Sequence, residues 1–297
     1  LVHCNADWQP SDLVESEYVD GFNYADIEDF SFSSGTFVHY VNYKFSLPNE
    51  DMKILKSGNY LVKIYPENDP NEVLLQSRFM VSENVVSVHQ TVTSRTDIDY
   101  NNSHQQLSID VNTLKFNVQN KYSDLKLSVT QNGREDNKVM VDNPLRVSGN
   151  VITYANNRAL IFPAGNEYRR METVNINRPS MGVLRMEYNH PYYHAELNAD
   201  QMRATDSYIY DETQHGRFFI RNADVTDSDI GAEYIVTHFA LNTDGPLTGG
   251  RIYLNGEFAN NSFTPQYMMH YDASSGMYLI DLVLKQGAYN YQYLWVP

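Results

Sequence analysis

The sequence predicts an all-β protein built from two to three consecutive antiparallel β-sandwich domains of immunoglobulin-like or early-set-like type. Turn residues interrupt the chain about every eight to twelve residues, and the stretches between them alternate apolar and polar side chains. The clearest cases are Tyr60–Tyr65, which follows Ser57-Gly58-Asn59, and Met277–Leu284, which follows Ser275-Gly276. A period of two places every second side chain on one face of a strand, so we expect each strand to bury one face.

The length of 297 residues exceeds a typical domain of about 100–150 residues, so more than one domain is expected. We place an N-terminal immunoglobulin-like sandwich at residues 1–84. Its expected strands are Phe30–Phe32, Phe37–Phe45, Tyr60–Tyr65 and Val73–Val81. The last two form a hairpin in this interpretation, because the turn formers Glu67–Pro70 separate them. A helical turn or two is expected within Ser11–Tyr18, with Ser11 as a possible N-cap.

A central β domain is predicted at residues 85–205. Its expected strands are Val86–Val92, Gln106–Val111, Lys126–Thr130, Val151–Tyr154, Ala159–Phe162 and Val183–Tyr188. A C-terminal early-set-like sandwich follows at residues 206–297, with strands at Phe218–Arg221, Tyr234–Leu241, Arg251–Leu254, Tyr267–Tyr271, Tyr278–Leu284 and Tyr289–Trp295. One further helical turn is predicted at Ala199–Ala204.

The net charge of −15 argues against nucleic-acid binding and against docking on anionic lipid, because both need a basic surface. No apolar run reaches the roughly 20 residues of a membrane helix, so direct membrane insertion is not expected. Cys4 is the single cysteine, which excludes an intrachain disulfide. The start Leu1–Cys4 resembles the middle of a strand, so we expect that an upstream signal segment has been removed.

Two groups of residues have the composition of a metal site, but their spacing favours structural roles. His190 and His194 lie four apart, yet Pro191 disfavours the helix that would bring two such ligands together. Asp224, Asp227 and Asp229 lack the glutamate that completes an EF-hand loop. We therefore expect no metal and no cofactor.

No catalytic motif stands out, so we do not expect an enzyme. Carboxylate pairs such as Asp7 with Glu15, or Glu233 with Asp281, could serve a glycosidase, but the sequence cannot place them about 5–9 Å apart. Nucleophile elbow, phosphate loop and zinc-protease motifs are missing from the sequence. A hydrolase with a site between domains is kept as a third hypothesis.

The C-terminal segment supports a second hypothesis, carbohydrate binding. The strand Gly287–Tyr293 is similar to the closing strand of early-set modules, including glycogen-binding ones. Binding would use exposed aromatic rings, and Trp295 and Phe258 are the candidates. The alternative function is thus that of a carbohydrate-binding surface or periplasmic protein that acts through its C-terminal domain. A glycan is possible as a ligand in this hypothesis, whereas other small-molecule ligands are not expected.

Several unusual segments occur in a fixed order along the chain: His3–Ser11, Gln131–Asn137, Gly165–Arg170, Tyr193-His194 and Lys285–Tyr291. In this order they resemble the type 9 secretion system plug protein family of Bacteroidetes, long catalogued as a domain of unknown function. The resemblance covers nearly the whole chain. It implies a periplasmic protein, associated with the outer membrane, that closes the periplasmic mouth of a large secretion barrel as its protein partner.

The resemblance supplies no catalytic residues, because none are established for the family. It also implies further strands after Pro297, so we expect the third sheet to be incomplete in this chain. The residues that carry the resemblance are Asp7, Trp8, Pro10, Asn132, Arg134, Asp136, Asn137, Asn166, Glu167, Arg169, His194, Gln286 and Gly287.

These motif residues have a physical interpretation of their own. Asp136-Asn137 and Gly165-Asn166 are turn dipeptides whose short side chains bond nearby backbone amides. Cations are scarce in this acidic chain, and arginines form forked pairs with carboxylates. We expect Arg134, Arg169 and Arg170 to lock loops through Asp7, Asp136 or Glu167, with direct contact to a partner as the alternative.

Overall fold

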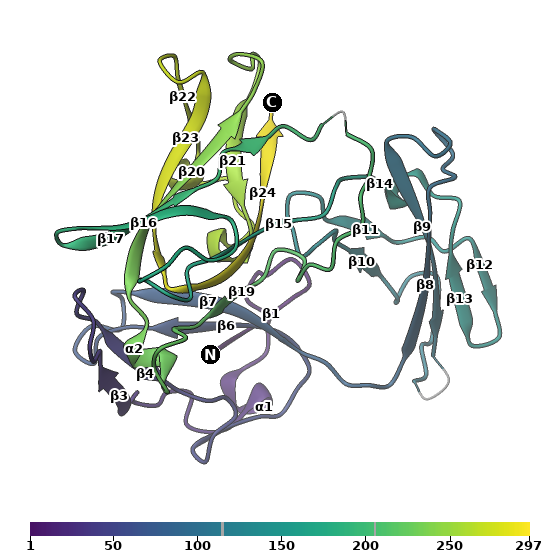
Figure 1. Ribbon diagram of the computed structural model, residues 1–297. Coiled ribbons are helices and arrows are strands. Elements are labelled where there is room, and N and C mark those ends of the chain that lie inside the picture. The colour runs from purple at the N-terminus through teal and green to yellow at the C-terminus, as the bar shows by residue number, and fades with distance from the viewer. Residues whose placement is uncertain (114–115, 205) are drawn as a thin grey trace. The chain divides into compact units, whose positions relative to one another are not determined.

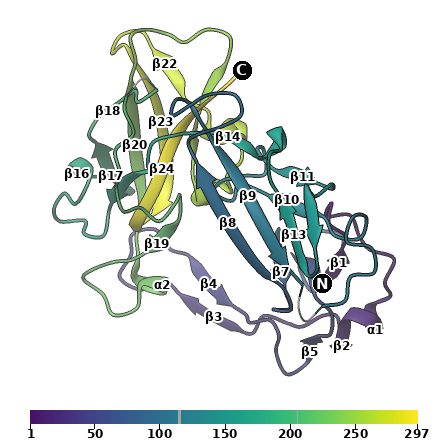
Figure 2. The same cartoon turned by 90° about the vertical axis from the view of Figure 1, so that its right-hand side faces the viewer.

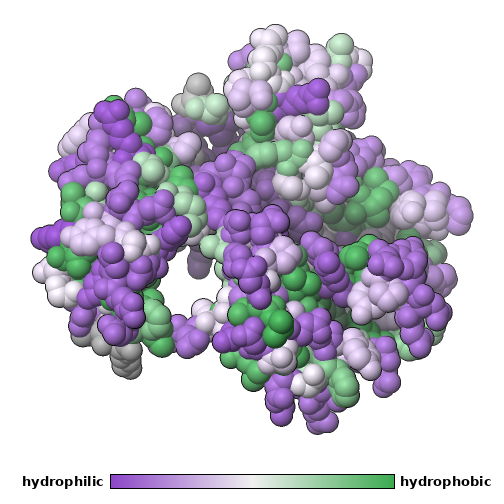
Figure 3. Space-filling model, turned by 180° about the vertical axis from the view of Figure 1, so that it is seen from behind, coloured by the Kyte–Doolittle hydropathy of each residue, from purple (hydrophilic) through white to green (hydrophobic). Residues whose placement is uncertain are grey.

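The computed structural model describes residues 1–113, 116–204 and 206–297. Its regular structure is nearly all β, as predicted, with short strands in several mainly antiparallel sheets (Figure 1). The α-helices α1 (Glu15–Tyr18) and α2 (Ser228–Gly231) have four residues each. Among the described residues no helix has the length and apolar character needed to cross a bilayer. The face drawn in Figure 3 is largely hydrophilic, with apolar groups in small separate clusters.

The described chain divides into two compact units. Unit 1 comprises Leu1–Phe32 and Val41–Val85, and unit 2 comprises Ser33–Tyr40 and Val86–Pro297. The division into domains at 1–84, 85–205 and 206–297 stays a prediction. The short segment Ser33–Tyr40 is notable because it is separated in sequence from the rest of unit 2.

Unit 1 contains three small antiparallel sheets. Its strands are β1 (Val2–Cys4), β2 (Val19–Gly21), β3 (Asp29–Phe32), β4 (Val41–Lys44), β5 (Met52–Ile54), β6 (Gly58–Ile64) and β7 (Leu75–Val81). The first sheet has the order β1-β6-β7, and β2–β5 and β3–β4 form the two others. Strands β6 and β7 form the predicted hairpin. Tyr60 is fully buried in the core, and its ring stacks on Phe79 with centroids 5.3 Å apart.

Two predictions for unit 1 are wrong in their boundaries. The strand expected at Phe37–Phe45 is confined to β4, because the preceding residues form the loop that joins β3 to β4. The helix begins at Glu15 and not near Ser11. Its N-cap is Val14, whose backbone N–H donates to the Glu17 carboxylate at 2.9 Å.

The first sheet of unit 2 has five strands. They are β8 (Ser87–Thr93), β9 (His104–Asn112), β12 (Arg146–Ser148), β13 (Val151–Tyr154) and β14 (Ile161–Pro163). Strand β9 pairs with β8 on one side and with β13 and β14 on the other, as Figure 2 shows for β8, β9 and β13. The hairpin of β10 (Leu127–Val129) and β11 (Val139–Val141) packs Val141 into the core formed by Ile109, Val111 and Ile152.

The rest of unit 2 is a sandwich of two sheet layers. One layer contains β16 (Val183–Asn189), β17 (Tyr192–Leu197), β18 (Asp200–Gln201), β20 (Tyr234–Asn242), β22 (His270–Asp272) and β23 (Met277–Lys285). In the other, the long strand β24 (Gly287–Val296) pairs with β15 (Arg169–Glu172), β19 (Phe218–Ile220) and β21 (Arg251–Asn255). Both layers contribute to one core, which includes Ile235 and Phe239 from the first and Tyr289 and Tyr291 from the second.

The sandwich differs from the sequence prediction in a few places. Strands β17 and β18 run parallel to β20, whereas all other pairs are antiparallel among the described strands. Ala199–Ala204 contains strand β18 and no helix. Two predicted strands begin as 3-10 turns, Arg158–Leu160 before β14 and Pro265–Tyr267 before β22, and a third such turn is Glu257–Ala259. Asp227 is the N-cap of α2, which gives it a structural role.

A buried carboxylate holds the loop Ser33–Tyr40 within unit 2. Glu233 is only 4% exposed, and its oxygens accept the backbone N–H groups of Phe37 at 2.5 Å and Val38 at 3.2 Å. It also accepts the N–H of Tyr234 at 2.8 Å. A buried carboxylate is tolerated when donors fill its oxygens in this way.

Tyr40 closes the same loop. Its hydroxyl donates to the Ala232 carbonyl at 2.9 Å, and the Lys285 ammonium lies 4.1 Å from its ring centroid. Burial raises the pKa of Tyr40 to about 12, so it remains a donor at neutral pH. The ring of Phe37 packs against Tyr188 at 4.8 Å between centroids.

We expect the substitution Glu233→Gln to destabilise the protein by about 1–3 kcal/mol, because an amide cannot accept at both ends and leaves a buried N–H without a partner. The free energy of unfolding from urea titration measures the loss. Glu135→Gln is the control: Glu135 is a well-exposed surface acid, and its replacement is expected to cost less than about 0.5 kcal/mol. Equal effects of the two substitutions would contradict a locking role for Glu233.

Candidate functional site

The first group of motif residues forms the loop between β10 and β11. Asn132 and Gly133 adopt left-handed conformations, with φ of 56° and 70°, and reverse the chain. Arg134 donates from Nε and Nη2 to the two oxygens of Asp136, at 3.0 and 2.6 Å. The Asn137 side chain accepts the backbone N–H of Gln131 at 3.1 Å. The loop is thus closed by its own side chains.

The second group of motif residues holds a distant loop. The Asn166 side chain accepts the backbone N–H of Ile209 at 3.1 Å. Glu167 accepts the hydroxyls of Tyr208 at 2.5 Å and Thr213 at 3.2 Å, and its hydrogen bond raises the pKa of Tyr208. The loop that is held in this way exposes 60–74% of three bulky side chains, Tyr208, Ile209 and Tyr210. We call these three residues the apolar loop tip.

Arg169 is tied into the core through Asp200. Its Nη1 lies 2.7 Å from Asp200 Oδ1, and the hydroxyls of Tyr291 and Tyr293 donate to Asp200 Oδ2 at 2.8 and 2.9 Å. Burial first, and then the charge of Asp200, raises the pKa of Tyr291 well above its usual range. Both phenols therefore act as donors, and one carboxylate joins β15, β18 and β24.

The two motif groups meet in unit 2. Gln131 Nε2 donates to the Pro163 carbonyl at 2.9 Å, which ties the β10–β11 loop to the end of β14. The Tyr168 hydroxyl accepts from Gln292 Nε2 at 3.0 Å, and the Asn132 side chain lies beside this hydroxyl. We call residues 131–137 and 163–169 the motif cluster. It forms a continuous network from the β10–β11 loop to β24.

Gln286 and Gly287 have a structural role at the start of β24. Gln286 is fully buried, and its side chain and backbone exchange hydrogen bonds with the backbone of Glu233 at 3.2 and 2.7 Å. A Cβ added to Gly287 would lie 2.4 Å from the carbonyl oxygen of Phe219. Only glycine therefore lets β19 approach β24 at this point.

Three further motif residues belong to unit 1. Asp7 and Pro10 belong to a turn of unit 1, in which Asp7 accepts the N–H of Gln9 and Pro10 bridges to Cys4. Trp8 has a φ of 64°, and the Arg78 guanidinium carbon lies 4.8 Å from its ring centroid. The three arginines expected to lock loops pair within unit 2: Arg134 with Asp136, Arg169 with Asp200 and Arg170 with Asp211.

His194 lies in a row of side chains across three strands. Its Nδ1 is 2.9 Å from His238 Nε2, and His238 Nδ1 is 2.7 Å from Asp281. His190, by contrast, contacts Tyr188 in the β16–β17 hairpin. The described residues contain no group of three or more His, Cys, Asp or Glu that could hold a metal ion.

The residues suggested for other chemistry have structural partners. Glu233 and Asp281 are engaged with backbone amides and with His238, respectively. Phe258 is half-buried against the core and makes T-shaped ring contacts with Tyr289 and Tyr267. Trp295 is 48% exposed and lies over Gly250. Trp295 is thus the more accessible of the two rings proposed for carbohydrate stacking.

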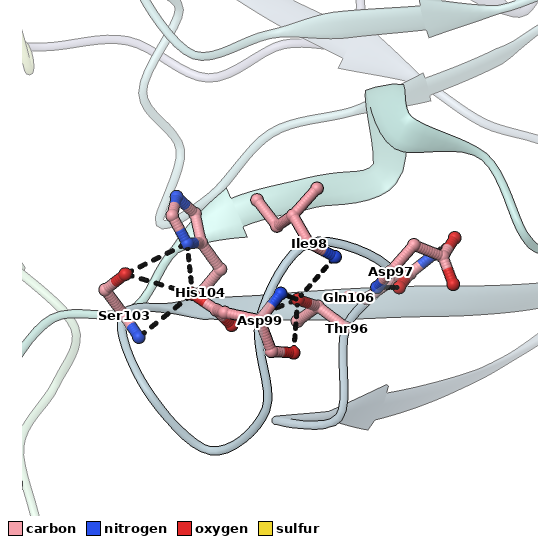
Figure 4. Close-up of polar contacts among 7 residues, drawn as sticks. All are labelled: Thr96, Asp97, Ile98, Asp99, Ser103, His104 and Gln106. Atoms are coloured by element: carbon pink, nitrogen blue, oxygen red, sulfur yellow. Dashed lines mark hydrogen bonds and ion pairs between the residues drawn. The ribbon is translucent and has the colours of Figure 1, made fainter.

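Sequence reasoning missed a rigid loop at the end of the β8–β9 hairpin (Figure 4). Asp99 accepts from His104 Nδ1 at 2.7 Å, from the hydroxyls of Ser103 and Thr96, each at 3.0 Å, and from the Ser103 N–H at 3.2 Å. Gln106 and Asp97 close the loop from the other side with a reciprocal pair of hydrogen bonds. The signal available in the sequence is Thr96-x-x-Asp99, a spacing typical of side-chain turns.

These bonds to Asp99 predict an acid-sensitive contribution to stability. The pKa of Asp99 is lowered to about 2, chiefly by the bond from His104 and further by Ser103 and Thr96. An unfolded aspartate has a pKa of about 3.9, so the stabilisation is complete above that pH and is lost as the pH falls towards 2. Between about pH 4 and pH 2 we expect wild-type stability to fall more steeply than that of Asp99→Asn. Urea midpoints measured across this window test the difference.

Ser103→Ala is the companion variant. It removes one donor and keeps His104, so its pH profile is expected to lie between those of the wild type and Asp99→Asn. Parallel profiles for all three proteins would show that Asp99 does not carry the acid sensitivity.

Comparisons with known proteins identify relatives of this chain. The family model of the type 9 secretion system plug protein 1st domain matches residues 1–83. A crystal structure of a hypothetical protein from Parabacteroides merdae is 44% identical, with a TM-score of 0.95 over 100% of this chain and 74% of the other. No curated protein matches the chain.

The family match agrees with the resemblance to the plug protein family. The residues matched by the family model end between β7 and β8. The similarity to the solved relative also covers all of unit 2. This match connects the protein with type 9 secretion. Residues 1–83 belong to the family of the type 9 secretion system plug protein 1st domain.

Proposed function

We propose that this protein is a non-enzymatic subunit that closes the periplasmic end of a type 9 secretion barrel in the outer membrane. The match of residues 1–83 to the first domain of plug proteins is the observation that carries this proposal. The protein would reside in the periplasm and bind the barrel from that side. Its action would be to occupy space and to release the opening when a substrate passes.

The way in which the loops are held supports a role of this kind. A subunit that blocks an opening needs surface loops that keep their shape under contact, because flexible loops lose entropy on binding. In unit 2, Asp99, Glu167 and Asp200 each accept hydrogen bonds from several donors at the ends of strands. These bonds preorganise the loops without any requirement for reaction chemistry.

The apolar loop tip is the contact region that we propose for the barrel. Tyr208, Ile209 and Tyr210 are exposed, and the motif residues Asn166 and Glu167 fix the loop that carries them. Tyrosine is enriched at the energetic centres of protein interfaces, because it buries a large area with few rotatable bonds. The motif cluster would then position the contact without forming it.

Replacing the apolar loop tip with alanine is therefore expected to weaken recovery of the secretion barrel. If the apolar loop tip contains an interface hot spot, the triple variant Tyr208→Ala, Ile209→Ala and Tyr210→Ala loses at least about 2 kcal/mol of binding free energy, or roughly 30-fold in affinity. The measurement is affinity purification of the tagged protein from mildly solubilised outer membranes, with the barrel quantified by mass spectrometry.

A matched control replaces three other exposed apolar side chains of unit 2, Phe116, Tyr122 and Leu145, which are 50–57% exposed. This control is expected to recover the barrel as the wild type does. Failure of the wild type itself to recover any outer-membrane barrel would overturn the proposed function. Equal recovery by wild type and loop-tip variant would instead overturn only the assignment of the contact.

A further inference from the structure

Strand β8 is an exposed sheet edge. It pairs with β9 through all seven of its residues, and no second strand pairs with it among the described residues (Figure 2). All seven side chains are exposed. An edge strand leaves alternate N–H and C=O groups unpaired along its free side, and these groups can pair with another strand.

The composition of β8 distinguishes it from the other long edges. Three edge strands of seven residues occur in the described chain, namely β7, β8 and β16. Strand β7 carries Arg78 at its centre, and β16 carries Arg185 and Glu187. Charged residues at an edge discourage pairing with another chain, because a charge must be desolvated or opposed by a like charge. The segment Ser87–Thr93 has no charged residue and no proline.

One face of β8 continues an apolar surface up to this edge. Val88 is paired with Val111 and Val92 with Leu107, two residues of the core that β10 and β11 cover. Cross-strand partners lie on the same face, so both valines belong to the core face of the sheet. They are nevertheless 60% and 51% exposed. An added strand with apolar residues opposite them would extend this core.

The sequence of β8 is complementary to itself. In antiparallel pairing about a two-fold axis at Gln90, Val88 of one copy lies opposite Val92 of the other, and His89 lies opposite Thr91. The outer residues Ser87 and Thr93 then also face each other, and the two Gln90 side chains meet on the axis. Apolar pairs and pairs of hydroxyl side chains stabilise antiparallel strands. An interface of this kind is isologous, with the same patch contributed by both copies.

We propose that two copies of this protein associate through β8, forming one continuous sheet across a two-fold axis at Gln90. The locked loop at the end of the β8–β9 hairpin supports this interface, because it holds β8 in its extended conformation before association. Two chains of charge −15 repel each other, and the electrostatic repulsion is smallest where the facing surfaces are uncharged, as they are along β8.

These properties set the strength and salt dependence of the dimer. A seven-residue strand pair buries less than the roughly 1,200 Å² of a stable interface, so the dimer is weak and depends on concentration. Added salt screens the repulsion between the two acidic chains over about 10 Å at 0.1 M, so association strengthens with ionic strength. The inference does not depend on the proposed function.

Charge substitutions at Gln90 provide the test, since they place like charges opposite each other on the axis. We expect Gln90→Lys and Gln90→Glu each to weaken association of the full chain by about tenfold or more, because like charges directly across a strand pair repel. A mixture of the two variants is expected to associate again, as a heterodimer with opposite charges on the axis. Sedimentation-velocity ultracentrifugation over a range of protein and salt concentrations measures the dimer.

Gln76→Lys and Gln76→Glu on β7 are matched controls, because Gln76 is an exposed glutamine on another edge strand. They are expected to leave the dimer unchanged. A wild type that stays monomeric at several hundred micromolar would overturn the proposal, and so would Gln90 variants that associate like the wild type. The proposed dimer would also be overturned if the protein stayed monomeric and bound the secretion barrel through β8, with barrel binding lost in both Gln90 variants.

Discussion

The architecture of unit 2 depends on a simple constraint: a carboxylate removed from water must have its oxygens filled by donors. Glu233 meets this requirement with backbone N–H groups, two of which come from residues almost 200 positions earlier in the chain. Asp200 meets it with Arg169 and with two tyrosines from β24. Each carboxylate therefore fixes several chain segments at once. Their removal would leave unpaired donors in the interior and not simply a missing contact.

This way of holding loops explains why the residues of the motif cluster form one network although they are separated in sequence. Asn132 in the β10–β11 loop lies beside Tyr168 in the segment before β15, and Glu167 in the same segment is hydrogen-bonded to Tyr208 of the apolar loop tip. The conformational entropy of these loops is lost when the protein folds, before any partner binds. A surface prepared in this way favours recognition by shape, because little conformational freedom is left to lose on contact.

The strand pattern was predictable, since alternation with a period of two is a local property; β13 coincides with the predicted Val151–Tyr154. The loop at Phe37–Tyr40 could not be predicted, because its alternation of apolar and polar residues is that of a strand. Its backbone N–H groups instead donate to Glu233, a residue almost 200 positions later in the chain. The pairing of Arg134 with Asp136 lies within one turn and could be anticipated. The partner of Arg169 could not be predicted, because Asp200 lies 31 positions away on a different strand, β18.

In the function proposed above, the protein acts by occupying an opening with a preorganised surface. The most direct test is the ionic conductance of the purified secretion barrel in a planar bilayer, measured before and after addition of this protein to the periplasmic side. We expect large open-channel currents from the barrel alone and their loss on addition of the protein. Currents that stay unchanged, although the protein is bound to the barrel, would contradict it.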